Sequence, residues 1–205
     1  MPDDRRPANE ELSAPLPPPR PEVFISVDIE SAGPTPGLYS MLSIGACLVD
    51  APEHGFYVEL KPTTDAVLES AIAIGGLDMD TLAREGVDPA EAMARFDEWL
   101  KSEVPSGSVP VFVGFNAGFD WMFVADYFER FLGRNPFGHA ALDIKSYFMG
   151  ISGSTWAQTS MRFLAPRYLH GRKLTHNALG DARDQAELFR KVREEAARIR
   201  PHSGV

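Results

Sequence analysis

The stretch from Val23 to Gly33, "VFISVDIESAG", constrains the fold of this chain more than any other. Its β-branched and aromatic residues predict a buried strand, because such side chains suit a pleated, packed surface. Asp28 and Glu30 stand two residues apart at the end of that strand, so they point to the same face of a sheet. Two carboxylates that lose solvent together repel each other and are costly to ionise. The fold must therefore bring compensating groups to this strand end.

The hydrophobic pattern of the whole chain predicts three strands followed by alternating helices and strands. The strands are expected at residues 23–29, 41–49, 56–60, 109–115 and 141–144, and the helices at residues 89–102, 119–132 and from 177 to about 200. Asp88 and Asn177 are expected to cap the first and last helix, and Gly133 to end the second. Short linkers between the first three strands favour antiparallel pairing. The order predicts an α/β fold with a mixed sheet, antiparallel in its first three strands, flanked by helices.

The amino-terminal segment differs in composition from the rest. Residues 1–21 hold seven of the seventeen prolines, which predicts an extended or disordered tail rather than part of a core. We expect residues 22–200 to form one domain. The tail is either a plain extension or a ligand for a proline-binding partner.

Composition narrows the class of function. A formal net charge of −9 argues against broad binding to duplex nucleic acid, which relies on many Lys and Arg contacts, but it permits a narrow site where metal ions supply the positive charge. Cys47 is the only cysteine, so an internal disulfide is impossible and a cytoplasmic location is expected. No apolar run approaches the roughly 20 residues of a membrane helix, and the amino terminus lacks the apolar core of a signal peptide.

Further acidic residues stand at the ends of predicted elements. Asp120 opens a helix directly after a buried strand, where α/β folds place ligands, although an acid there also complements the helix dipole. His176 precedes the last helix and Asp181 lies in its first turns. Asp184 could share the face of Asp181, but pairing with solvent or a nearby arginine is the more ordinary arrangement.

Each of these residues is a weak signal by itself, and only their joint occurrence indicates a functional site. The set holds four carboxylates and one histidine, and hard oxygen ligands in this number are typical of Mg²⁺ or Mn²⁺ sites. Two such cations would also neutralise Asp28 and Glu30. The sequence therefore predicts a centre for divalent metal ions.

The same residues resemble the DEDD 3′→5′ exonucleases, the superfamily of RNase T, oligoribonuclease and the epsilon subunit of DNA polymerase III. The matching motifs are "SVDIESAG", "GFNAGFDWMFV" and "HNALGDARDQAELF", and the likeness spans residues 22 to 195. His176 stands five residues before Asp181, and Asn177 occupies the position where the other branch has tyrosine. The chain thus resembles the histidine branch, DEDDh, which implies an RNase H-like fold. It departs from the family in its Pro- and Gly-rich loop after Glu30 and in Phe115, where many relatives have histidine.

The resemblance implies a metal-dependent 3′→5′ exonuclease that acts on single-stranded RNA or DNA ends and releases nucleoside 5′-monophosphates. It implies two divalent ions, Mg²⁺ or Mn²⁺, with Asp28 shared between them. Glu30 and Asp181 would hold the ion that activates water, and Asp120 the second ion. His176 would be the general base, since an imidazole with a free pKa of about 6.5 accepts protons at neutral pH.

Substrate contacts are expected mainly from the loop after Glu30. Its backbone amides would hold the terminal sugar, and an apolar or aromatic side chain would stack on the base. A basic stretch before His176 is either a phosphate track or a solvated loop. The candidates are Ser31, Ala32, Gly33, Leu38, Tyr39, Met41, Asn116, Trp121, Arg172 and Lys173.

Two other classes of function compete with this one. A catalytically silent nucleic-acid-binding module with the same fold would be expected to lack at least one of the five core residues, and all five are present. An interaction protein that works through its Pro-rich tail would need the tail for function but not for catalysis. The expected partners are single-stranded 3′ ends and no membrane, and the resemblance also allows a homodimer. The sequence does not separate RNA from DNA, because one hydroxyl contact can decide that choice.

Overall fold

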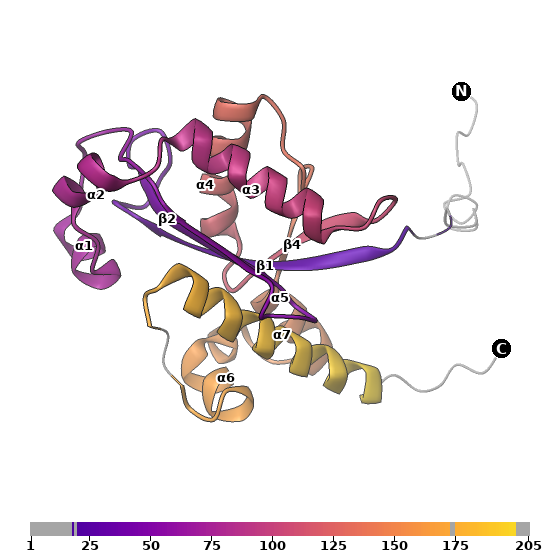
Figure 1. Ribbon diagram of the computed structural model, residues 1–205. Helices are drawn as coiled ribbons and strands as arrows, with labels where there is room; N and C mark the ends of the chain where they lie inside the picture. The colour runs from indigo at the N-terminus through magenta and orange to yellow at the C-terminus, as the bar shows by residue number, and fades with distance from the viewer. Residues whose placement is uncertain (1–17, 19, 173–174, 200–205) are drawn as a thin grey trace, which may run out of the picture.

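The computed structural model describes residue 18 and residues 20–172 and 175–199, and its centre is a mixed five-stranded sheet (Figure 1). The strands are β1 (Glu22–Ser31), β2 (Met41–Leu48), β3 (Gly55–Glu59), β4 (Val109–Gly114) and β5 (Ala141–Asp143). They lie in the order β3-β2-β1-β4-β5. The first three strands pair antiparallel, while β4 runs parallel to β1 and β5 parallel to β4. The predicted fold class is confirmed.

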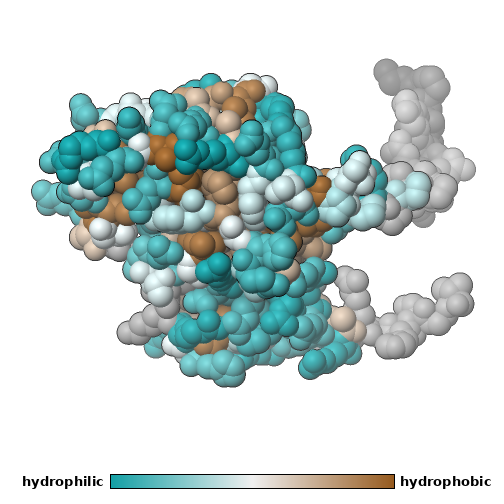
Figure 2. Space-filling view, in the orientation of Figure 1, coloured by the Kyte–Doolittle hydropathy of each residue, from teal (hydrophilic) through white to brown (hydrophobic). Residues whose placement is uncertain are grey.

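Helices cover both faces of the sheet (Figure 1). The helices on one face are α3 (Pro89–Glu103) and α4 (Gly118–Leu132), and those on the other are α5 (Ile144–Ser152), α6 (Met161–Tyr168) and α7 (Ala178–Ile199). Two short helices, α1 (Glu69–Gly75) and α2 (Met79–Glu85), lie at the end of the sheet where β1 finishes. Hydrophobic side chains reach the surface beside these two helices, whereas α7 presents a mostly hydrophilic face (Figure 2).

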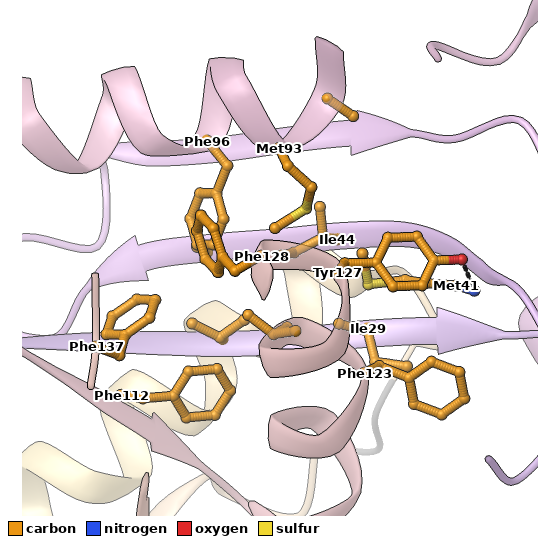
Figure 3. Close-up of a cluster of buried hydrophobic side chains, with 14 of the residues drawn as sticks. Ile29, Met41, Ile44, Met93, Phe96, Phe112, Phe123, Tyr127, Phe128 and Phe137 are labelled. Atoms are coloured by element: carbon orange, nitrogen blue, oxygen red, sulfur yellow. Dashed lines mark hydrogen bonds between the residues drawn. The ribbon is translucent and has the colours of Figure 1, made fainter. Parts of the chain in front are cut away.

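The larger core lies between the sheet and the pair α3 and α4 (Figure 3). Phe96 of α3 stacks on Phe128 of α4 with ring centroids 5.5 Å apart, and both rings are fully buried. Tyr127 turns its hydroxyl to the backbone of β2, where it accepts a hydrogen bond of 2.8 Å from the amide of Met41. Buried aromatic rings of this size contribute most of the free energy gained by burying such a core.

The predicted strands and the three predicted helices all form, within two or three residues of their expected ends. The expected caps are confirmed: Asp88 accepts from the Ala90 amide at 2.9 Å, Asn177 accepts from the Gly180 amide at 3.0 Å, and Gly133 ends α4 in the left-handed region. The predicted tail, residues 1–21, falls almost wholly outside the described residues. None of the described helices has the length and apolar character needed to cross a bilayer.

Helices α1, α2, α5 and α6 were not predicted, and each has a local reason. Helices α1 and α2 span only seven residues each, too few to show a helical period. Helix α5 follows β5 without a break, because Asp143 both ends the strand and caps the helix by accepting from the Ser146 amide at 2.9 Å. Helix α6 contains Pro166, which sequence patterns treat as a helix breaker.

Candidate active site

The end of β1 projects beyond its parallel neighbour, and this opens the site. Pairing between β1 and β4 ends at Ser26 and Val113, so the later residues of β1 have no strand partner on that side. The Ile29 amide instead donates to Oδ1 of Asp120 at 3.1 Å. Asp120 lies in the first turn of α4 and is buried, so this bond fixes it beside the strand that carries Asp28 and Glu30.

Helix α7 can approach the same strand end closely because the residue of β2 that it lies against is a glycine. Gly45 faces Asp28 across the antiparallel register, and a Cβ added to it would lie 2.2 Å from the carbonyl carbon of Ala178. The backbone of the first turn of α7 therefore rests directly on β2. This close approach brings Asp181, which is only 2 % exposed, over the end of β1.

Asp181 holds the loop that carries the histidine. Its Oδ1 accepts from the Thr175 amide at 2.7 Å, and its Oδ2 accepts from the His176 amide at 2.9 Å. His176 is exposed and has φ of +56°, a left-handed conformation uncommon outside glycine. One ligand atom each of Glu30, His176 and Asp181 lie within 4.8 Å of one another. The structure thus brings Glu30, His176 and Asp181 together, and Asp28 and Asp120 lie close enough for their charges to act on one another and on Glu30.

Burial and mutual repulsion make these carboxyl groups weak acids. Burial, followed by the charges of Asp120, Asp181 and Glu30, raises the pKa of Asp28 well above its ordinary value. Burial and the charge of Asp181 raise the pKa of Glu30 to about 7. Burial raises the pKa of Asp120 to about 8, against the effect of its hydrogen bond from Ile29. Among the described residues, no lysine or arginine forms an ion pair that would offset their charge when they ionise.

Gln185 is a member of the site that the sequence analysis missed. It is 1 % exposed, its Nε2 donates to Oδ1 of Asp28 at 2.6 Å, and its Oε1 accepts from the Phe115 amide at 2.8 Å. The bond to Asp28 favours the ionised carboxylate. A signal was available: Gln185 stands four residues after Asp181 and therefore shares its face of the helix.

The loop after Glu30 is mostly engaged in its own packing. The amide of Ala32 donates to the Ser40 carbonyl at 2.9 Å, so it is not free to hold a substrate. A Cβ added at Gly33 would lie 2.4 Å from the Tyr39 ring, so that ring covers the glycine. Leu38, with 58 % of its surface exposed, is the large apolar side chain of this loop that reaches the surface.

Several other expected substrate contacts are engaged in packing or in hydrogen bonds within the protein. Met41 is fully buried in the core and does not reach the surface. The Ser31 hydroxyl donates to the Gly33 carbonyl at 2.8 Å within the loop. Trp121 is half-buried with its ring 5.3 Å from that of Phe112, which makes it a packing residue of the larger core.

The basic stretch before His176 is partly neutralised. Arg172 pairs with Asp184 at 2.7 Å and also contacts Glu187, so it is not a free phosphate ligand. This pair confirms that Asp184 belongs to an ordinary ion pair. Asn116 is exposed in the turn between β4 and α4 with φ of +66°, and Lys173 lies outside the described residues.

The donor set fits divalent cations. Four carboxylates and an imidazole are ligands that Mg²⁺ and Mn²⁺ accept. Within the described part of the chain, no lysine or arginine pairs with any of the four acids. Glu30 sits beneath α1, where a Cβ added to Gly75 would lie 3.0 Å from its Oε2, so the carboxylate is positioned before any ligand arrives.

Residues 25–189 match the family model described as Exonuclease, RNase_T. The chain belongs to this family. A curated relative, the 3′-5′ DNA exonuclease Cap18 of Escherichia coli, is 47 % identical over 171 residues, covering 83 % of this chain and 91 % of the relative. Together with the five residues above, this makes the chain a member of the DEDDh 3′→5′ exonuclease superfamily.

Solved structures show the same fold in this family. The nuclease domain of 3′hExo, a DEDDh family member bound to rAMP, superposes with a TM-score of 0.70 at 13 % identity and covers 89 % of this chain and 97 % of its own. Exonuclease I of E. coli in complex with a dT13 oligonucleotide has a TM-score of 0.67 at 18 % identity, covering 87 % of this chain and 42 % of its own. Both similarities show a shared fold.

Proposed function

We propose that this exonuclease removes nucleotides one at a time from the 3′ end of single-stranded DNA and releases nucleoside 5′-monophosphates. The observation that carries the proposal is the convergence of Asp28, Glu30, Asp120, Asp181 and His176 on one strand end, where no basic side chain of the described residues pairs with the acids. An anionic phosphodiester would be repelled from such a site in the absence of cations.

Two divalent ions, Mg²⁺ or Mn²⁺, are the proposed cofactors. Asp28 would contact both ions, Glu30 and Asp181 one of them, and Asp120 the other. When bound, these ions supply positive charge for the phosphate and the leaving oxygen, and acidity for water. The raised pKa values of Glu30, about 7, and Asp120, about 8, support this assignment, because groups that resist ionising gain most from a bound cation.

His176 is the proposed general base. Its ring lies at the edge of the acid cluster and is exposed, so it can take a proton from water and pass it to solvent. Asp181 holds the backbone of His176, which fixes the direction of approach. A neutral imidazole accepts the proton without adding a fifth negative charge to the resting site.

The choice of DNA rests on the relative that is 47 % identical and named a DNA exonuclease. A single strand suits the site because an acidic chain with a formal charge of −9 offers little to the two backbones of a duplex. A homodimer remains a prediction, which light scattering of the purified protein would test.

The test compares two labelled substrates under defined metal conditions. Purified protein is incubated with 5′-labelled single-stranded DNA or RNA of one sequence, with Mg²⁺, Mn²⁺ or EDTA. The expected result is a ladder that shortens from the 3′ end, faster on DNA, and absent with EDTA. Mass spectrometry of the products should show nucleoside 5′-monophosphates.

Asp184→Asn is the matched control, because Asp184 stands one helical turn from Asp181 but pairs with Arg172. It should keep nearly full activity.

Undiminished cleavage in EDTA would contradict the metal assignment, and faster cleavage of RNA would contradict the choice of DNA.

A further inference from the structure

An aromatic and a basic side chain form a shelf beside the second acid motif. The ammonium of Lys145 lies 4.0 Å from the ring centroid of Trp156 and 5.9 Å from that of Phe115. Trp156 keeps 50 % of its surface exposed, an unusual arrangement for the largest apolar side chain. We refer to Lys145, Trp156 and Phe115 as the aromatic shelf.

The shelf is connected to the acid cluster by hydrogen bonds. Gln185 bridges the Phe115 amide at 2.8 Å and the Asp28 carboxylate at 2.6 Å. Asp143, at the start of the helix that carries Lys145, accepts from the Ala117 amide at 3.1 Å. The shelf therefore borders the turn between β4 and α4, which leads into Asp120.

The short helix that carries Trp156, η2 (Trp156–Thr159), is held in place by its own side chains. Oε1 of Gln158 accepts from both the amide and the hydroxyl of Thr155, at 2.9 and 3.0 Å. The Thr159 hydroxyl donates to the Trp156 carbonyl at 2.7 Å. Because the turn is already ordered, its exposed indole can bind a base with little loss of conformational entropy.

Lys145 is available to an anion. None of the carboxylates that the structure describes pairs with it, while Arg167, Arg172 and Lys191 on the same side of the sheet all have acidic partners. In a chain of net charge −9, an unneutralised lysine over an exposed indole joins the two features that single strands need, a stacking surface and a phosphate contact.

We propose that the aromatic shelf binds a nucleotide of the single strand on the 5′ side of the terminal one, with a base against Trp156 and a phosphate at Lys145. This inference rests on the proposed function, since it assumes that the strand end lies among the acids. Because the shelf lies outside the acid cluster, it should strengthen binding of longer strands and leave the chemistry at the terminal nucleotide unchanged.

The experiment compares a long and a minimal substrate. The long one is dT12, and the minimal one is the p-nitrophenyl ester of thymidine 5′-monophosphate, which has a single nucleotide. Trp156→Ala should lower kcat/KM on dT12 by about 5- to 150-fold, the range for loss of stacking on one base, and leave the ester within about twofold. Trp156→Phe should keep most of the activity on dT12.

Phe163→Ala is the control, because Phe163 is 51 % exposed with the guanidinium of Arg162 5.7 Å from its ring centroid. Phe163→Ala should leave the ratio of kcat/KM on dT12 to kcat/KM on the ester unchanged. Lys145→Gln gives a second test: the slope of log affinity against log salt for dT12 should shrink by about 0.7, the value for one phosphate contact on a single strand.

The results distinguish failure of the shelf proposal from failure of the proposed function. If Trp156→Ala matches Phe163→Ala on dT12, or impairs both substrates equally, the shelf does not bind the strand. If the wild type cleaves neither substrate, the proposed function fails. Anisotropy of labelled dT12 on Asp28→Asn protein, with and without Trp156→Ala, then still decides whether the shelf binds DNA.

Discussion

The two halves of the active site are built differently. Asp28, Glu30 and Asp120 stand on a strand and on the first turn of a helix, and the first and last of these are tied by hydrogen bonds to Gln185 and Ile29. His176 stands in an exposed connection, in a left-handed conformation, and is held through its backbone by Asp181. The acids on β1 and α4, which we call the rigid half, are half-buried or buried, whereas His176, the group proposed to move a proton and here called the accessible half, is exposed to solvent.

This difference fits the roles proposed for the two halves. Electrostatic stabilisation works best when the charges are fixed before the reaction, since no free energy is then spent on rearranging them. A general base must exchange its proton with solvent after each turnover, so exposure serves it. Asp181 joins the two halves, because the first turn of its helix rests on β2 through Ala178 and Leu179, while its carboxylate holds the histidine loop.

The largest expected effect comes from the rigid half. Asp28→Asn keeps the size of the side chain and its acceptor for Gln185, but removes the charge proposed to contact both ions. Turnover should fall by at least about 10³-fold. The metal-free protein should melt higher than wild type, since one member of a mutually repelling set is neutralised.

Thermal melts in EDTA and initial rates on labelled DNA measure both effects. Asp126→Asn is a suitable control because Asp126 pairs with Arg130 on the exposed face of α4. A metal-free melting temperature of Asp28→Asn clearly below wild type would contradict the repulsion between the buried acids.

The accessible half should show a different signature. His176→Ala removes the proposed base but none of the four acids, so turnover should fall roughly 10²–10⁴-fold while metal affinity stays close to wild type. Added imidazole should restore part of the rate. Calorimetry with Mn²⁺ and rates with and without imidazole would measure the two properties separately.

His54→Ala is the control for this variant, because His54 pairs with Glu103 at the opposite end of the sheet. If His176→Ala loses as much metal affinity as Asp181→Ala does, the histidine is a ligand, and the contrast between the two halves fails at this residue.

A smaller effect is expected at the buried bridge between Asp28 and Phe115. In Gln185→Met the new side chain has a similar volume but cannot make either hydrogen bond. The buried groups left without partners should lower the free energy of unfolding by about 1–3 kcal/mol. We expect turnover to fall about tenfold and the apparent Mn²⁺ affinity to weaken. Gln185→Glu should be worse, because it adds a charge to a set that already repels itself.

The sequence predicted most of the sheet, and it pointed to the strand end where the four acids lie, for identifiable reasons. Strand periodicity placed Asp28 and Glu30 on one face, and strong local caps at Asp88 and Asn177 fixed two helices. Burial patterns of this kind are local properties, and local properties can be read from a chain one segment at a time.

The surroundings of the expected substrate contacts depend on tertiary packing. Met41, the first residue of a predicted strand, was a candidate contact for a base, but it is fully buried and its amide donates to the Tyr127 hydroxyl. Arg172 looked like a phosphate ligand, but α7 brings Asp184 and Glu187 to it. Gln185 was missed because its importance comes from a partner 157 positions away in the sequence. The spacing of four residues from Asp181 shows the shared helix face, but not the partner that Gln185 meets there.

The smallest effect concerns stability and pH, and it tests the charge of the rigid half as a whole. Burial raises the pKa of Glu30 to about 7 and that of Asp120 to about 8, from ordinary values near 4. Between pH 4 and 8 the folded, metal-free protein therefore holds protons that the unfolded chain has released. Its free energy of unfolding must fall as pH rises through this window, and the contribution is fully present only below about pH 4.

We expect the melting temperature in EDTA to drop by at least about 3 °C between pH 5.5 and 8, the shift that roughly 1 kcal/mol produces in a domain of this size. Excess Mn²⁺ should reverse the trend, because the metal competes with protons for the same oxygens and stabilises the folded state most where they are ionised. Asp120→Asn should flatten the metal-free slope, whereas Asp184→Asn should change it much less. A metal-free melting temperature that rises steadily from pH 5.5 to 8 would mean that these acids are ionised in the folded protein without a cation, and the reason for assigning metal ions to this strand end would be lost.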